Sequence, residues 1–282
     1  MQTEMYFRPR TVDEALSLLV ERRPQPLAGG TDVYPALASG AAPVPLLDLG
    51  GIEGFAGPVV EDADGFVIPP LATWTTVIET PLPPQFDVLR EAGREVGGRQ
   101  IQNRGTVVGN VCNASPAADG TVALMALDAR VRLRGPDGSR EVPLVDFVVG
   151  NRRTLRRPDE LVVALVVPRR DGARSAFRKL GARRYLVISI AMTAVVVTEH
   201  DGLVASAAVA VGSCNARAVR LASIERWLIG RPLAEAAAEL VDGPPLPELA
   251  PITDIRAEAA YRARAARLLI ADALAACGTG RG

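Results

Sequence analysis

The chain has 282 residues, and at about 150 residues per domain this length suggests two domains or one large domain. Basic and acidic residues number 32 each, so no net charge attracts nucleic acid or an anionic membrane. The chain has one histidine and three scattered cysteines, which excludes multi-histidine metal sites and four-cysteine clusters within it. The cysteine usage also favours a reducing compartment over a disulfide framework, so we expect redox chemistry here to come from a bound cofactor.

No export or membrane signal is expected from the hydropathy pattern. The first ten residues are polar and lack the apolar stretch of a signal peptide. The most apolar segment, residues 186–197, is far shorter than the ~20 residues needed to span a bilayer. The sequence therefore predicts a soluble, cytoplasmic protein without membrane insertion.

The first fifty or so residues predict a small α/β unit. Thr11 followed by Glu14 is typical of a capping box, and apolar residues at helical spacing follow it. After a proline-containing break comes Leu27-Ala28-Gly29-Gly30-Thr31-Asp32, which precedes a second expected helix over 33–39. Residues 45–49 predict a short buried strand.

Strands and turns dominate residues 57–168, which indicates a mixed α+β unit. The pattern predicts helices over 88–96 and 121–129. It also predicts a hairpin with its turn around 136–138 and a buried strand over 160–167. Residues 99–119 are polar and glycine-rich with almost no periodicity, so we expect a long functional loop there.

The last third predicts antiparallel strands followed by helices. Two apolar strands are expected at 185–198 and 203–211, joined by a hairpin turn at 199–202. Helices are expected at 218–229, 233–240 and 255–276. The fold class is therefore α+β. Its expected domains are residues 1–170, in two subdomains split near residue 55, and a smaller C-terminal domain of residues 171–282.

Two glycine-containing segments carry the candidate binding chemistry. In the first, residues 28–32, glycines would let a ligand approach the backbone, and amides at the start of a helix bind anions. A plain turn or helix cap explains this segment equally well. The second, residues 104–111, offers a hydroxyl and a side-chain amide suited to diphosphate or ribitol oxygens, and polar residues extend it to Asp119. A surface loop is its alternative.

Neither segment matches the P-loop or the dinucleotide-binding pattern, which disfavours ATP on a P-loop and a Rossmann site. Two separate amide-rich segments would suit an extended ligand with a pyrophosphate at its middle.

Together these segments resemble the FAD-binding medium subunit of the molybdenum hydroxylases, the xanthine dehydrogenase and carbon monoxide dehydrogenase flavoprotein family. The resemblance covers nearly the whole chain. The matching segments are 6–9, 27–34, 99–110, 114–119, 159–161, 177–179 and the helix around Tyr261 and Arg262. The sequence departs from the family pattern at Val108, where a second consecutive glycine is usual. Because valine does not take positive φ cheaply, either the backbone is ordinary there or the local FAD contact differs.

The resemblance implies that this chain binds FAD and supplies no catalytic residue and no metal ligand. The first segment would contact the FAD diphosphate and adjoining groups, the second would add further contacts with Asp119 on ribityl or ribose hydroxyls, and three residues would lie around the isoalloxazine. These residues are Leu27, Ala28, Gly29, Gly30, Thr31, Asp32, Val33 and Tyr34; Thr106, Gly109, Asn110 and Asp119; and Val96, Leu161 and Lys179.

Several of these residues have simpler interpretations. Leu161 could be only a strand core residue, and Asp119 could cap the helix expected from residue 121. Cys112 is expected to be a small buried hydrophobe without a redox role, and His200 to be solvated in its turn. Lys179 is the only lysine among the 32 basic residues, which indicates either chance retention or a need for a compact ammonium where a planar guanidinium would not fit.

The resemblance also implies a three-subunit enzyme. A large subunit would carry the molybdopterin cofactor and hydroxylate the substrate, and a small iron–sulfur subunit would hold two [2Fe–2S] clusters. This chain would take electrons from the clusters to FAD and pass them to NAD⁺, O₂ or another acceptor, in an expected dimer of heterotrimers.

The substrate of such a complex is predicted from the first segment. It reads Gly-Gly-Thr-Asp, whereas carbon monoxide dehydrogenase flavin subunits more often carry Gly-Gly-His-Ser, so an aromatic-heterocycle or purine-type substrate is favoured. The alternatives are the medium subunit of an aerobic carbon monoxide dehydrogenase and a free-standing FAD-dependent oxidase.

Overall fold

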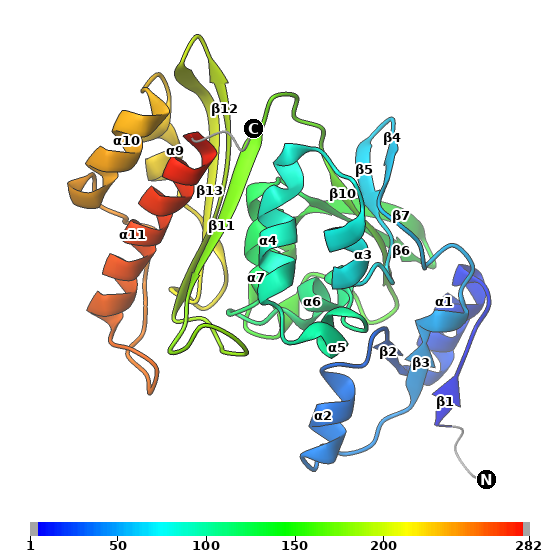
Figure 1. Ribbon diagram of the computed structural model, residues 1–282. Helices are drawn as coiled ribbons and strands as arrows, with labels where there is room; N and C mark the ends of the chain where they lie inside the picture. Colours follow the sequence, from blue (N-terminus) through cyan, green and yellow to red (C-terminus); the bar gives the residue numbers. More distant parts are fainter. Residues whose placement is uncertain (1–4, 279–282) are drawn as a thin grey trace.

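The computed structural model describes residues 5–278, which form three successive units along the chain. Figure 1 shows a small N-terminal unit at one end, a central unit of helices on a sheet, and a C-terminal unit of long strands covered by helices at the other end. The expected α+β fold class is confirmed. Within residues 5–278, no helix is long and apolar enough to cross a membrane.

The N-terminal unit is the small α/β unit that the sequence predicts. Its three parallel strands lie in the order β1-β3-β2. The elements are β1 (Tyr6–Phe7), α1 (Val12–Arg22), β2 (Gln25–Leu27), α2 (Val33–Ala38) and β3 (Leu46–Asp48). The Thr11 hydroxyl accepts a hydrogen bond from the Glu14 N–H at 3.1 Å, which confirms the cap of α1.

The central unit is a five-stranded antiparallel sheet with short helices beside it, in the strand order β4-β5-β10-β6-β7. Its strands are β4 (Val60–Asp62), β5 (Gly65–Ile68), β6 (Arg130–Gly135), β7 (Gly138–Pro143) and β10 (Leu161–Val167). Its helices are α3 (Trp74–Glu79), α4 (Asp87–Glu95), α5 (Arg99–Gln102), α6 (Val107–Asn113), α7 (Asp119–Ala126) and α8 (Leu144–Phe147). A two-stranded ribbon, β8 (Val148–Gly150) and β9 (Arg153–Thr154), completes the unit.

The C-terminal unit is a four-stranded antiparallel sheet in the order β11-β12-β13-β14. Its elements are β11 (Arg174–Leu180), β12 (Ala191–His200), β13 (Leu203–Gly212), β14 (Val219–Arg220), α9 (Ala222–Leu228), α10 (Leu233–Glu239) and α11 (Ala259–Gly278). The expected hairpin is confirmed, with Asp201 and Gly202 as its turn.

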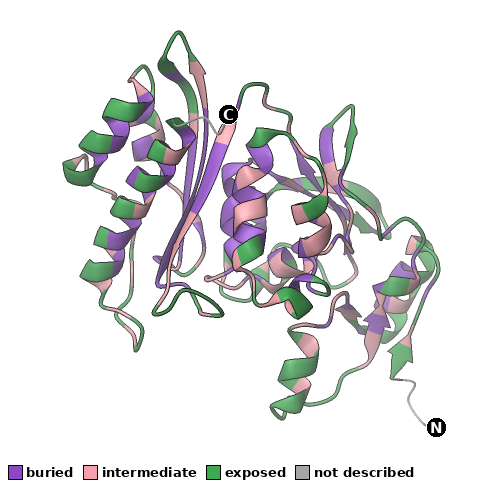
Figure 2. Cartoon of the chain, viewed as in Figure 1, coloured by how far each residue is buried: buried purple, intermediate pink, exposed green. Residues whose placement is uncertain are grey.

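Both faces of the C-terminal sheet are buried. Val196 of β12 packs in a core shared with α7, whereas Val195 and Val197 pack in a second core with α9, α10 and α11. This alternation follows from the two-residue period of a strand and explains why β12 is apolar nearly throughout. Figure 2 shows α7 buried along its whole length between the two sheets.

Four expectations from the sequence are wrong in detail. Residues 99–119 are mostly helical. The sequence did not indicate this because α5 has only four residues and the buried valines of α6 extend over little more than one turn, too short a run to show a helical period. The strand expected from residue 185 begins only at Ala191, and most of residues 182–188 are exposed, so apolar composition alone did not indicate a strand. The last helix begins at Ala259 because Asp254 accepts from the N–H groups of Arg256 and Ala257 in a turn. The helix expected over 218–229 is only α9, because Val219 and Arg220 pair with β13.

Candidate functional site

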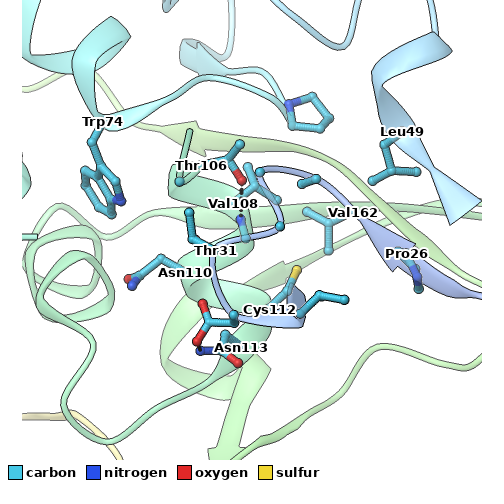
Figure 3. Close-up of a pocket in the computed structure, with 18 of the residues that line it drawn as sticks. Pro26, Thr31, Leu49, Trp74, Thr106, Val108, Asn110, Cys112, Asn113 and Val162 are labelled. Atoms are coloured by element: carbon cyan, nitrogen blue, oxygen red, sulfur yellow. Dashed lines mark hydrogen bonds between the residues drawn. The ribbon is translucent and has the colours of Figure 1, made fainter. Parts of the chain in front are cut away.

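A cavity of about 470 Å³ lies between the N-terminal and central units, and both glycine-containing segments line it. Figure 3 shows Thr31, Thr106 and Asn110 around its middle, with Trp74 on one side and Leu49 on the other. This volume is within the range of small-molecule and cofactor pockets in proteins.

The first segment approaches the second so closely that glycine is required. A Cβ on Gly29 would lie 1.8 Å from the Arg104 carbonyl oxygen, so no other residue fits between the two backbones. Gly30 has φ +74°, and a Cβ there would also lie 2.5 Å from the Tyr34 ring. Gly29 therefore permits the contact between the two segments, and Gly30 permits the left-handed turn of the first segment beneath the Tyr34 ring.

The second segment forms the start of α6. The Thr106 hydroxyl accepts from the Gly109 N–H at 3.0 Å and caps the helix. Val108 is the second helical residue, where its side chain is buried and lines the cavity. The departure from the family pattern at this position is therefore accommodated by an ordinary helical backbone.

One polar atom of the cavity wall has no protein partner. Asn110 Oδ1 is buried and accepts no hydrogen bond from the part of the chain that the structure describes. An unsatisfied buried acceptor costs roughly 1–3 kcal/mol, and a hydroxyl or N–H on a ligand would remove this cost. The cavity therefore fits a ligand that carries a donor at this point.

A polar cluster joins the two segments at the rim. Asn113 donates its Nδ2 to Asp32 Oδ1 at 2.8 Å, and the Arg152 guanidinium contacts Asn113 Oδ1 and lies 3.8 Å from Asp32. The Arg156 guanidinium lines the cavity and donates to the Glu160 carbonyl at 2.7 Å. Asp32 thus bridges the two segments, and Arg156 brings positive charge to the wall.

Lys179 and Asp119 form a buried ion pair next to the cavity wall. Lys179 Nζ lies 2.7 Å from Asp119 Oδ2, and the two side chains are 8% and 7% exposed. Burial raises the pKa of Asp119, and the nearby Lys179 ammonium opposes this effect. Asp119 is the first residue of α7 and makes no side-chain cap, so the expectation that it caps this helix is wrong. Lys179 is correspondingly not an ordinary solvated residue.

The ion pair is linked to the cavity through the residue after Asp119. A Cβ on Gly120 would lie 2.2 Å from the Trp74 ring and 2.9 Å from Asn110 Oδ1, and both of those side chains line the cavity. The start of α7 therefore packs directly behind the wall.

The structure brings most of the residues predicted from the sequence to one cavity. Those that line it are Ala28, Gly29, Gly30, Thr31, Asp32, Val33, Val96, Thr106, Gly109, Asn110 and Leu161. Leu161 is at once a buried strand residue and part of the wall. Outside the lining are Leu27, which packs in the interior, Tyr34, which is exposed, and the buried pair of Asp119 and Lys179.

Sequence reasoning missed several lining residues, including Trp74, Leu49, Val162 and Arg156. The sequence could have indicated Trp74 as a candidate wall residue, because it is one of two tryptophans in the chain and directly follows the N-cap Thr73. It could not have indicated Arg156, because nothing distinguishes this residue among the 31 arginines of the chain. The expectation that Cys112 is buried as a hydrophobe is also wrong, because it lines the cavity with an accessible side chain.

The Cys112 thiol is nevertheless not poised for chemistry. The protein around it raises its pKa to about 11 by desolvation, which outweighs the opposing charge of Arg156. A thiol with this pKa is protonated at neutral pH and is a poor nucleophile. Within residues 5–278, no three histidine, cysteine, aspartate or glutamate side chains come together in a way that could hold a metal ion.

Comparison with known proteins agrees with this geometry. The family described as "FAD binding domain in molybdopterin dehydrogenase" matches residues 1–170, and "CO dehydrogenase flavoprotein C-terminal domain" matches residues 175–277. The nicotinate dehydrogenase FAD-subunit of Eubacterium barkeri is 32% identical over 244 residues, covering 83% of this chain and 82% of that protein. The nicotine 6-hydroxylase medium subunit of Paenarthrobacter nicotinovorans is 28% identical over 261 residues, covering 91% of each.

The fold agrees with a solved structure over its whole length. A chain of the carbon monoxide dehydrogenase from Oligotropha carboxidovorans superposes with a TM-score of 0.88 at 27% identity, covering 98% of both chains. The two family matches together cover nearly the entire sequence. The chain therefore belongs to the family of FAD-binding medium subunits of the molybdenum hydroxylases.

Proposed function

We propose that the chain binds one FAD non-covalently in the cavity between its two glycine-containing segments and serves as the electron-transfer subunit of a cytoplasmic molybdenum hydroxylase. The observation that carries this proposal is the cavity itself, in which Gly29 brings one segment against the backbone of the other, and which the unpartnered Asn110 also lines. The flavin supplies the redox chemistry, and the protein orients it and adjusts its electronics.

In this proposal the two glycine-containing segments bind different parts of FAD. The first segment presents its backbone to the diphosphate, and the Arg156 guanidinium adds positive charge to the same cavity. Leu27 and Tyr34 support the segment from outside the lining. Thr106 and Asn110 meet the hydroxyl groups of the ligand.

We place the Lys179–Asp119 pair, together with Val96 and Leu161, around the isoalloxazine. The contact of Gly120 with Trp74 and Asn110 supports this, because it puts the ion pair immediately behind the wall. Asp119 was expected on the ribityl or ribose hydroxyls, but its two carboxylate oxygens already bond to Lys179 and Ser189.

The partners proposed for the chain are an iron–sulfur small subunit and a molybdopterin large subunit, assembled as a dimer of heterotrimers. The names of the two relatives support this, since one is an FAD-subunit and the other a medium subunit. Electrons from the [2Fe–2S] clusters would reach the flavin and leave to NAD⁺, O₂ or another acceptor. The family membership favours this subunit role over a free-standing oxidase.

For the substrate of the complex we propose an aromatic N-heterocycle. Two relatives are named for nicotinate and nicotine, which both contain a pyridine ring. Thr31 and Asp32 stand where carbon monoxide dehydrogenase flavin subunits more often carry His-Ser, which supports the same class over carbon monoxide. The substrate would be chosen in the molybdopterin subunit.

The binding proposal is tested by replacing Gly30 with valine and measuring FAD per chain in the purified protein. Gly30→Val should lower flavin occupancy severely, because the new side chain meets the Tyr34 ring and strains a residue with φ +74°. Gly54→Val is the matched control, since Gly54 has φ +77° with no atom within 4 Å of a Cβ and lies outside the lining. Full FAD in Gly30→Val would contradict the placement of the diphosphate.

A further inference from the structure

Arg262 of α11 is a buried cation that holds two backbone segments together. Its side chain is 3% exposed. Its Nη1 donates to the carbonyls of Ile190 and Ser213 at 2.6 and 3.1 Å, and its Nη2 donates to Asp254 Oδ1 at 2.6 Å. Its Nε is a buried donor without an acceptor in the described part of the chain. The guanidinium is therefore placed by the two carbonyls and the carboxylate.

The first of these segments holds Asp119 directly. Ser189, the neighbour of Ile190, is buried and donates its hydroxyl to Asp119 Oδ1 at 2.9 Å. The other carboxylate oxygen of Asp119 pairs with Lys179. Ser189 and Lys179 thus fix both oxygens of the carboxylate, and Ser189 stands at the end of the exposed segment 182–188, which has no regular structure of its own.

The second segment holds the backbone that leads into Asp119. The Ser213 N–H donates to the Pro116 carbonyl at 3.0 Å, three residues before Asp119. Ser213 has φ +61°, a strained conformation for serine that needs support from its surroundings. The hydrogen bond from Arg262 to the Ser213 carbonyl supplies such support.

We propose that Arg262 is a positioning residue for the flavin end of the cavity: by holding Ile190 and Ser213 it fixes the Asp119 carboxylate through Ser189 and through Pro116. A lysine could not replace it, because one ammonium cannot span three acceptors as a planar guanidinium does. The inference rests on the proposed function, in which Asp119 and Lys179 lie beside the isoalloxazine.

The experiment compares Arg262→Lys with Arg267→Lys in the assembled complex. Arg267 lies on the same helix and also donates to two backbone carbonyls, those of Leu240 and Pro244, but has no link to Asp119. Arg262→Lys should weaken FAD binding at least tenfold and change the visible absorption of the bound flavin. Arg267→Lys should leave both unchanged, even where it lowers thermal stability as much.

Ser189→Ala is a second variant that tests the same link to Asp119 if Arg262→Lys does not fold. It removes only the hydroxyl that joins the held segment to Asp119, and it should weaken FAD binding several-fold with the same spectral change. Wild-type FAD affinity and spectrum in Ser189→Ala, or equal effects of the two lysine variants, would overturn the inference. Gly30→Val distinguishes failure of this inference from failure of the proposed function. If Gly30→Val loses FAD and Arg262→Lys has no effect, the proposed FAD site stands and only the role of Arg262 is refuted.

Discussion

The Lys179–Asp119 pair is a buried ion pair on which the stability of the protein depends. Both side chains are almost wholly buried, and each carries the charge that makes burial of the other tolerable. Removing one partner of such a pair typically costs about 3–5 kcal/mol, because the remaining charge is left uncompensated. Ser189 is the further hydrogen-bond partner of Asp119.

Lys179→Met is expected to lower the flavin midpoint potential. The variant removes a buried positive charge behind the cavity wall, and about 1.4 kcal/mol corresponds to ~30 mV in a two-electron couple, so the expected shift is tens of millivolts. Potentiometric titration of the flavin-loaded protein measures it. Arg178→Met is the control, because Arg178 is the neighbouring residue of the same strand and bonds instead to Asp272. An unchanged midpoint in Lys179→Met would remove this lysine from the flavin site.

Asp254 gives the protein a pH-dependent contribution to folding. Hydrogen bonds from the Arg256 N–H, and then from Arg262 and the Ala257 N–H, lower its pKa to about 2. A carboxyl whose pKa is depressed on folding stabilises the native state above its unfolded pKa of about 3.9, and this contribution is lost as the pH falls through the folded value.

The difference in unfolding free energy between wild type and Asp254→Asn should therefore be constant above about pH 5 and be lost progressively as the pH falls to about 1. Denaturant unfolding of the two proteins across this range measures it. A difference that persists unchanged at pH 2 would show that the pKa of Asp254 is not depressed by folding.

Helix α6 forms part of the cavity wall, so its stability affects the shape of the cavity directly. It has seven residues, and Gly109 and Asn110 of the cavity wall lie on it. Such a short helix depends strongly on its cap and on tertiary packing. Its cap is Thr106, whose hydroxyl satisfies one of the amides that the helix start leaves without a partner.

Thr106→Ala should lower the free energy of unfolding by about 1 kcal/mol and also weaken FAD binding, because the first turn of α6 would fray at the cavity wall. Thr11→Ala removes the equivalent cap of α1, where the hydroxyl accepts at 3.1 Å outside the cavity lining. It should cost similar stability and leave FAD affinity unchanged. Chemical denaturation and flavin titration of both variants separate these effects, and equal FAD affinity in the two would contradict the role of α6.

The same elements show what sequence could predict. The strands β12 and β13 and their turn were predictable, because long apolar runs on either side of an Asp-Gly pair have few other structures. The helices α5 and α6 were not, because they have only four and seven residues, too few for an apolar helical period to be recognised. The cavity followed from the two glycine-containing segments. Trp74 and Arg156 did not, because their place in the wall depends on tertiary packing.

At the scale of the molecule, the units share their cores. Residues of α7 pack against Val196 and Ala208 of the C-terminal sheet in the same cluster as Phe66 and Leu133 of the central sheet. Side chains also hold the units together, since Arg217 donates to the Val145 carbonyl at 2.7 Å. The Lys179–Asp119 ion pair crosses this junction, with Asp119 on the central unit and Lys179 on the C-terminal sheet. Under the proposed function, the C-terminal unit therefore contributes Lys179 to the flavin site as well as covering the core.

Anaerobic reduction of the assembled complex by its substrate tests the central claim most directly. We predict that the flavin absorption of the wild-type complex is bleached as the substrate is oxidised, and that the isolated FAD-loaded chain shows no bleaching with the same substrate. A complex assembled with Gly30→Val should reduce its iron–sulfur clusters and leave little flavin signal to follow. Substrate-dependent bleaching by the isolated chain, or a wild-type complex that carries no FAD in this subunit, would contradict the account.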